Sequence, residues 1–430
     1  MSHRKNVFAH LMKVIGPGQL FASAAIGTSH LVLSTRAGAH YGMIFLWIIL
    51  GTLVLKYPFF EFSSRYTNAT GRSLLDGYYL QGKWAILLVL GIMSVNMFAV
   101  TGAVGAVCAG IVSTMFGIGA IPVPLLLAVL FVITGGILLG GRYSLLDSFI
   151  KILSLVLLVT VCTAFTAVIF KGPLAPSVAL PSNADLLKGA GLTLLVSLIG
   201  FMPSGIEASI MQSMWTVEKV RTTGYKPTLK ETLLDFNIGY LFTSVLALMF
   251  LTIGAFTVFG SGTLLEGNST QFSNKLLQVF TFQLGKWTYP FIAVAAFGTI
   301  YGTFITVWDA FTRCFVGCLK PLVYTTVETT PRTQSFTTRM YNVMLPVIGT
   351  GGFLLFFLFS GGMIKILEAA TISVFISAPV LSFLNLRIMT GKDIPSSHRP
   401  GKKLLVLAGT GLLAMVVFGG YYLLTVLHVL

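Results

Sequence analysis

Two short polar segments interrupt apolar runs at corresponding places in the chain. The first reads Gly27-Thr28-Ser29-His30, and the second reads Met202-Pro203-Ser204-Gly205. Hydroxyl and imidazole groups hydrogen-bond polar solutes, whereas imidazole nitrogen and thioether sulfur also bind softer metal ions. The segments therefore predict a binding site for either a small polar solute or a metal cation.

His30 is the strongest single candidate, because an imidazole can bind a metal, accept a coupling proton or hydrogen-bond an organic solute. Met202 either binds a soft ion or lines an apolar pocket. Glu207 either approaches the site, stabilises a helix N-terminus or carries a proton. Simple structural roles remain as alternatives: backbone bonds for the histidine and close helix packing for the small residues. The predicted substrate-binding residues are Gly27, Thr28, Ser29, His30, Ile199, Met202, Ser204, Gly205 and Glu207.

Membrane helices are the elements that must position these residues. The 430-residue chain is 55% hydrophobic and only 10% charged, which is too apolar for a water-facing surface. Runs of the roughly 20 apolar residues needed to cross a bilayer recur along it. Continuous apolar stretches at 152–170 and 404–427 lack the alternation of an outer-membrane barrel. We therefore expect an all-α integral membrane protein.

The apolar runs predict eleven transmembrane helices. They are expected at 12–39, 42–64, 84–112, 120–140, 144–170, 190–218, 233–259, 287–318, 341–359, 362–388 and 404–428. Most of the 28 Lys and Arg fall in segments on the side of the N-terminus, which predicts an inside N-terminus and an outside C-terminus in a bacterial inner membrane. The formal charge of +15 is spread over short loops, so we read it as a topology signal and expect no nucleic-acid partner.

An internal repeat relates the two polar segments. Gly16-Pro17-Gly18 precedes Ile26-Gly27 by the same spacing with which Gly189-Ala190-Gly191 precedes Ile199-Gly200. Five helices separate the two patterns, so the halves at 1–171 and 172–391 should cross the membrane in opposite directions, with 392–430 as an additional helix. A broken helix at mid-bilayer frees backbone groups at a cost of several kcal/mol each, unless protein, water or a ligand satisfies them. Transporters place their binding sites at such breaks, whereas kinks used only for packing are the alternative.

Several short motifs resemble the NRAMP family of proton-coupled divalent-metal transporters, within the leucine-transporter-fold superfamily. They are Gly16-Pro17-Gly18, Arg36-Ala37-Gly38, Leu46-Trp47, Ser64-Arg65, Thr70-Gly71-Arg72, Gly141-Arg142-Tyr143 and Met202-Pro203. The resemblance implies a 5+5 inverted repeat with broken helices 1 and 6, and alternating access around a site between them.

The sequence departs from this family at the residues that carry its chemistry. The family's Asp-Pro-Gly-Asn in helix 1 aligns with Gly27-Thr28-Ser29-His30, and its Met-Pro-His becomes Met202-Pro203-Ser204. The helix-3 acids associated with proton movement align near Thr101 and Val104. Because hard cations prefer anionic oxygen ligands, conventional manganese or iron transport is not expected. The alternative is a divalent or soft metal cation bound by His30 and Met202.

A secondary active transporter for a small polar solute is therefore the leading prediction, with a proton or sodium ion as the coupling ion of a symport. We expect no cofactor, because the chain shows no ATP-binding motif. An intramembrane enzyme would need a nucleophile with its base, or a metal cluster such as His-Glu-x-x-His, and neither pattern occurs. A channel or sensor is the remaining alternative. The sequence leaves the oligomeric state open.

Overall fold

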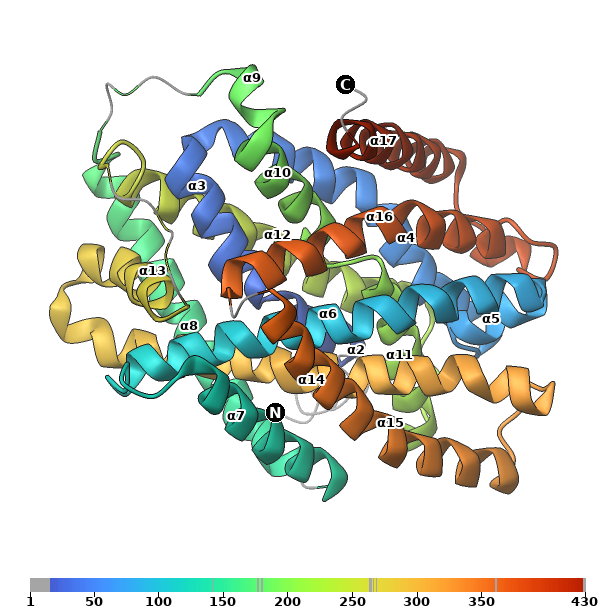
Figure 1. Ribbon diagram of the computed structural model, residues 1–430. Coiled ribbons are helices and arrows are strands. Elements are labelled where there is room, and N and C mark those ends of the chain that lie inside the picture. The colour runs from blue at the N-terminus through green and yellow to red at the C-terminus, as the bar shows by residue number, and fades with distance from the viewer. Residues whose placement is uncertain are drawn as a thin grey trace, which may run out of the picture.

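The computed structural model describes residues 16–427 except 142, 176–177, 179–180, 263–264, 266, 268 and 360–361. Every regular element in these residues is helical. Figure 1 shows long helices packed into one bundle, with α6 and α14 running side by side through its centre. The predicted all-α fold is confirmed.

The first half begins with a broken helix and continues with longer helices. Its elements are α2 (Pro17–Ala25), η1 (Thr28–Ser34), α3 (Thr35–Tyr41), η2 (Gly42–Ile44), α4 (Phe45–Thr70), α5 (Leu74–Gln81), α6 (Lys83–Met115), α7 (Val123–Leu139) and α8 (Tyr143–Lys171). Here η1 is a π-helix and η2 a short 3₁₀ turn.

The second half again begins with a broken helix. Its elements are α9 (Asn183–Leu186), α10 (Gly189–Phe201), α11 (Glu207–Thr223), α12 (Leu229–Thr257), α13 (Ser269–Leu284), η3 (Lys286–Thr288), α14 (Tyr289–Tyr324), α15 (Pro331–Leu358) and α16 (Met363–Met389). The chain ends with η4 (Ser396–His398) and α17 (Lys402–Val426).

Length and hydropathy identify seven segments of the described chain that can cross a membrane. The first of them, Pro17–Thr70, contains both the broken first helix and α4, while α7, α10 and 155–171 are shorter apolar helices. This layout accommodates the eleven predicted crossings.

Two regions differ from the sequence-based expectation. The segment at 261–285, between two predicted spans, contains α13, which buries Phe272, Leu276 and Phe280 along one face at helical spacing. The segment at 320–340, also between two predicted spans, already contains the start of α15, because Thr330 and Thr333 form a capping box ahead of the apolar span. Span prediction missed α13, because its apolar residues lie on one face only. It began α15 at 341 instead of Pro331, because the first turns of this helix are polar.

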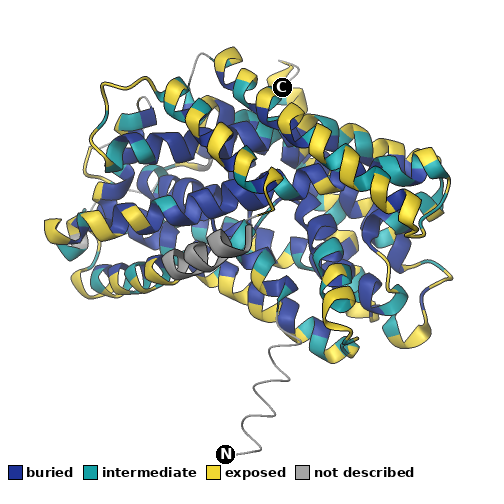
Figure 2. Cartoon of the chain, turned by 90° about the horizontal axis from the view of Figure 1, so that it is seen from below, coloured by how far each residue is buried: buried dark blue, intermediate teal, exposed yellow. Residues whose placement is uncertain are grey.

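The surface of the bundle is apolar. Figure 2 shows buried residues filling the interior and exposed residues along the outward faces. Large side chains such as Phe170 (87% exposed), Leu358 (77%) and Val132 (76%) point away from the protein. Lipid rather than water is the solvent that suits such a surface.

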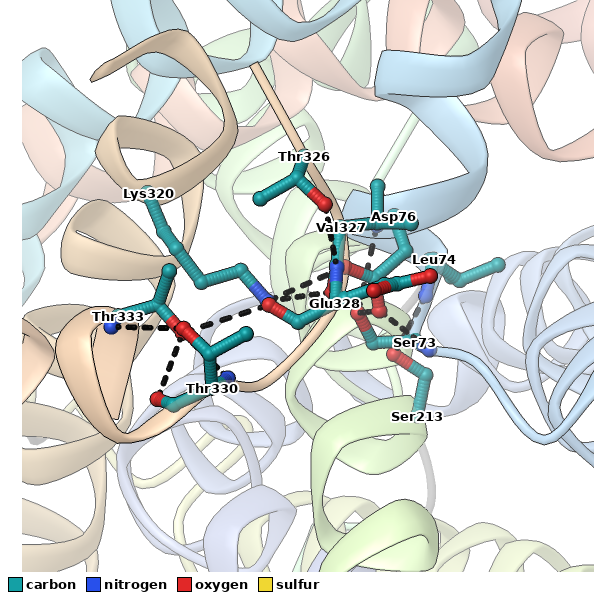
Figure 3. A network of polar contacts seen from close by, with 10 residues as sticks. All are labelled: Ser73, Leu74, Asp76, Ser213, Lys320, Thr326, Val327, Glu328, Thr330 and Thr333. Atoms are coloured by element: carbon teal, nitrogen blue, oxygen red, sulfur yellow. Dashed lines mark hydrogen bonds and ion pairs between the residues drawn. The ribbon is translucent and has the colours of Figure 1, made fainter. Parts of the chain in front are cut away.

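A polar network joins the connection between α4 and α6 to two other elements (Figure 3). Ser73 and Asp76 form a capping box at the start of α5, and the Leu74 amide donates to Ser213 Oγ of α11 at 3.0 Å. Lys320 near the end of α14 pairs with Asp76 at 3.8 Å and donates to the Val327 carbonyl at 2.9 Å. The second part of helix 6 is thereby linked, through α5, to the loop between α14 and α15.

Candidate functional site: two helix breaks

The break in helix 1 is short. Helix α2 ends at Ala25, Ile26 and Gly27 leave the helical conformation, and the chain resumes as a π-helix at Thr28. The Ala25 carbonyl, which has no helical partner here, accepts hydrogen bonds from the Gly27 amide at 2.8 Å and from Ser29 Oγ at 2.7 Å. The second part of helix 1 therefore satisfies the end of the first part.

His30 is completely buried and has a backbone oxygen at each ring nitrogen. Nδ1 lies 2.9 Å from the Ala25 carbonyl and 2.7 Å from Ser29 Oγ, and Nε2 lies 2.9 Å from the Thr243 carbonyl of α12. The imidazole thus connects the helix-1 break to α12. This is the structural role, with backbone partners, that the sequence left open as an alternative to ligand binding.

Gly27 allows a close approach between helix 1 and α14. A Cβ atom at this position would lie 2.6 Å from Thr303 Oγ1, well inside van der Waals contact. Thr303 Oγ1 itself donates to the Thr299 carbonyl at 3.1 Å. The missing side chain at Gly27 thus serves close packing between these two helices.

The break in helix 6 is longer. Helix α10 ends at Phe201, Met202 is extended and fully buried, its peptide bond to Pro203 is cis, and α11 starts at Glu207. Ile199 and Ser204 are half-buried, whereas Gly205 is buried. The last carbonyls of α10 therefore need partners from outside their own helix.

Lys56 of α4 supplies those partners. Its side chain is buried, and Nζ donates to the carbonyls of Ile199 at 3.1 Å, Gly200 at 3.0 Å and Ser204 at 2.8 Å. An ammonium group has three N–H donors, so all of them are used. The cation also lies at the C-terminal end of α10, where the helix dipole favours positive charge.

Glu207 opens α11 and is 4% exposed. Its carboxylate folds back over Gly205, where a Cβ atom would lie 2.5 Å from Oε2, and this oxygen has no hydrogen-bond partner within the described structure. Glu207 interacts electrostatically with Lys56. An acidic side chain in the first turn also suits the positive end of the helix dipole.

Packing brings the two breaks together, because η1 lies against α10. Seven of the nine predicted site residues are buried, and Ile199 and Ser204 are half-buried. The hydrogen bonds of His30 run to α2 and α12, not to helix 6. No group of three His, Cys, Asp or Glu side chains suited to a metal ion occurs among the residues whose placement is defined.

Three further acids in the predicted spans form ion pairs in the described structure. Arg36 of α3 pairs with Glu368 of α16 at 2.6 Å, Glu61 pairs with Arg65, and Asp309 pairs with Arg313 at 2.8 Å. Lys56 differs from them, because its three hydrogen-bond partners are backbone oxygens.

Sequence reasoning overlooked three contributors to this region: Lys56 as a ligand of the helix-6 break, the Thr243 carbonyl and Thr303. Only Lys56 left a readable signal, since it is the single charged residue between Phe45 and Phe60. A carbonyl oxygen has no sequence signature, and one more threonine in an apolar helix is unremarkable.

A helical membrane bundle with two adjoining helix breaks around a buried polar region has the architecture of a transporter. The sequence model of the "Natural resistance-associated macrophage protein-like" family, Nramp, matches residues 18–425, and the chain belongs to this family. An uncharacterized protein of Pasteurella multocida (strain Pm70) is 34% identical over 421 residues, which cover 96% of this chain and 92% of the relative.

Solved transporter structures share the fold. A mutant of the Eremococcus coleocola manganese transporter superposes with a TM-score of 0.68 at 13% identity, covering 96% of this chain and 86% of that one. MhsT in complex with L-phenylalanine superposes with a TM-score of 0.58 at 14% identity, covering 94% and 98%. A Na⁺-coupled sialic acid symporter gives 0.56 at 13% identity, covering 93% and 88%. The leucine-transporter-like fold inferred from the sequence is confirmed.

Proposed function

We propose that this protein is a secondary active transporter of a small polar solute, coupled to a proton or sodium ion. Access alternates between the two sides of the membrane around the site between the breaks of helices 1 and 6. Membership of the Nramp family and the likeness to solved transporters support the transport function. The identity of the solute rests on the side chains at the breaks.

The surroundings of His30 carry the proposal that the substrate is not a conventional manganese or iron ion. A ring nitrogen binds a metal through its lone pair, and the metal must lie where that lone pair points. A neutral imidazole carries this lone pair on one ring nitrogen only, and a backbone oxygen lies 2.9 Å from each nitrogen, so the direction is occupied in either tautomer. Metal binding by His30 would require the contact with Thr243 or Ala25 to break.

The remaining groups fit a neutral or zwitterionic polar molecule better than a hard cation. Glu207 is the one carboxylate among the nine candidate residues, and magnesium-like or manganese-like ions prefer several anionic or water oxygens. Its unpartnered Oε2 could accept a hydrogen bond from a solute N–H or O–H group. Relatives in fold that bind L-phenylalanine and sialic acid support an organic solute.

A soft or divalent metal cation remains the second candidate. Met202 is fully buried at the helix-6 break, and the Eremococcus coleocola relative in fold is a manganese transporter. This candidate requires His30 to turn toward Met202.

Transport by purified protein in proteoliposomes tests the proposal. A thermal-shift screen of polar metabolites and metal salts first selects the solute, since a ligand at 100 times its Kd adds about 2.7 kcal/mol of stability. Labelled solute should then accumulate above its external concentration when a proton or sodium gradient is imposed. Equilibration without accumulation would indicate a channel, and accumulation of manganese instead of an organic solute would refute the proposed substrate.

A further inference from the structure

The ammonium group of Lys56 lies in a ring of backbone oxygens that resembles a cation site. Two of the oxygens belong to the end of α10 and one belongs to the non-helical link before α11, so the cation bridges both sides of the break. The distances of 2.8–3.1 Å are those of good N–H···O hydrogen bonds.

We propose that Lys56 is a tethered cation that permanently fills a small carbonyl-lined site at the helix-6 break, and that it thereby keeps free cations out of this site. Lys56 excludes free cations because its own ammonium group already holds the oxygens that such an ion would bind.

The geometry explains why a cation, and not just any donor, occupies this place. The three oxygens carry partial negative charge, two of them lie at the negative end of the α10 dipole, and the site is buried from water. Without a cation these carbonyls would be left without partners in the membrane interior, which is costly. Since all three oxygens are uncharged, they suit a monovalent ammonium better than a divalent metal ion.

Glu207 is an acidic side chain at the same break. It lies at the opposite side of the break, at the start of α11, and it interacts electrostatically with Lys56. An acidic group across the break from Lys56 lowers the cost of placing a lysine in the middle of a membrane helix.

This proposal goes beyond the transport function and does not depend on which solute is carried. It concerns a site whose occupant is part of the chain, so protein stability reports on it. If no transported solute is found, the role of Lys56 can still be tested. If the role of Lys56 is refuted, the transport function can still be tested.

Chemical rescue of Lys56→Ala tests the tethered cation. The variant removes the ammonium and its three carbons, and leaves the carbonyls of residues 199, 200 and 204 in place. Ethylammonium chloride is the probe, because it is shorter than the deleted group and leaves room for van der Waals contact. Tetramethylammonium chloride has the same charge but no N–H donor. Lys83→Ala, at an exposed lysine that starts α6, is the matched control variant.

The melting temperature of the purified protein in detergent is the readout. Lys56→Ala should melt below the parent, and ethylammonium should restore most of the loss in a saturable manner. Tetramethylammonium should not, and neither salt should change the parent or Lys83→Ala. Equal effects of both salts, an equal effect on the parent, or no effect of ethylammonium on Lys56→Ala would each overturn the proposal.

If Lys56→Ala does not fold without an added cation, the yield of folded protein is the readout instead. The variant is then expressed, extracted and purified with ethylammonium present throughout, with tetramethylammonium in parallel. The proposal expects a monodisperse size-exclusion peak with ethylammonium alone. Absence of that peak in both preparations would count against a refillable cation site.

Discussion

Gly18 shows at the level of one residue why the Gly16-Pro17-Gly18 motif is needed. A Cβ atom at Gly18 would lie far inside contact distance of the Asp235 backbone oxygen, and one at Gly239 would do the same with the Gly18 oxygen. The Asp235 carboxylate accepts hydrogen bonds from the amides of Gly16 at 3.0 Å and Gly18 at 2.7 Å. Helix α2 therefore starts directly on the surface of α12.

Gly18→Ala should destabilise the protein by about 1–3 kcal/mol, the usual range for an overpacked contact that has to shift backbone. Gly16→Ala is the matched control. The three atoms nearest to a Cβ atom there all belong to the flexible end of the Lys219 side chain, the first of them at 3.3 Å. Thermal unfolding of the two variants in the same detergent measures the difference. Equal melting temperatures would mean that α2 does not pack as closely as described.

Residue types were predictable from the sequence at this scale, but their partners were not. His30 and Ser29 stand out as polar residues in an apolar run, yet the Thr243 carbonyl that holds His30 lies 213 residues away. Lys56 is equally conspicuous, and its three oxygens lie more than 140 positions further along the chain. Such contacts depend on helix packing, which one sequence alone does not specify.

The two breaks differ as elements, although the repeat suggested equivalent ones. Helix 1 resumes after two residues and satisfies its own carbonyl through Ser29, whereas helix 6 stays open from Met202 to Ile206 and relies on Lys56. Repeat spacing located both breaks in the chain. The length of each break depends on side chains that the repeat does not share.

Gly205→Leu and Pro203→Ala should reduce transport more than they reduce the amount of folded protein. A leucine at 205 would collide with the Glu207 carboxylate, and an alanine at 203 removes a residue that cannot continue a regular helix. Gly51→Leu is the control, since a Cβ atom at this exposed α4 position meets nothing within 4 Å. Uptake is normalised to the monodisperse protein recovered. Parental uptake rates in both variants would show that the helix-6 break is only a structural kink.

Topology is the corresponding prediction for the whole molecule. Eleven crossings with the N-terminus inside place the C-terminus outside and the connection between α11 and α12 inside, in agreement with the distribution of Lys and Arg. A reporter enzyme that is active only in the cytoplasm should therefore work when inserted at 224–228 and fail when fused after Leu430. A cytoplasmic C-terminus would contradict the eleven-helix arrangement and the inverted orientation of the two halves.

The overall architecture was the most predictable level. Span length, hydropathy and the repeat are properties of whole segments, so they survive errors at single positions. The helices that were missed, α5 and α13, bury one face against the bundle and do not have the composition of a span. The chemistry of the site was less predictable, because substitution of a few residues changes it while the fold of the family is retained.

Titration with manganese tests most directly the proposal that this member of the Nramp family does not bind hard divalent cations. Calorimetry at neutral pH, on protein free of tags and chelators, should show no saturable binding of manganese in the micromolar range. The reason is that the Gly27 and Ser204 positions supply no anionic ligand and His30 is held by backbone oxygens. Tight binding by the parent that is abolished in His30→Ala would contradict the claim.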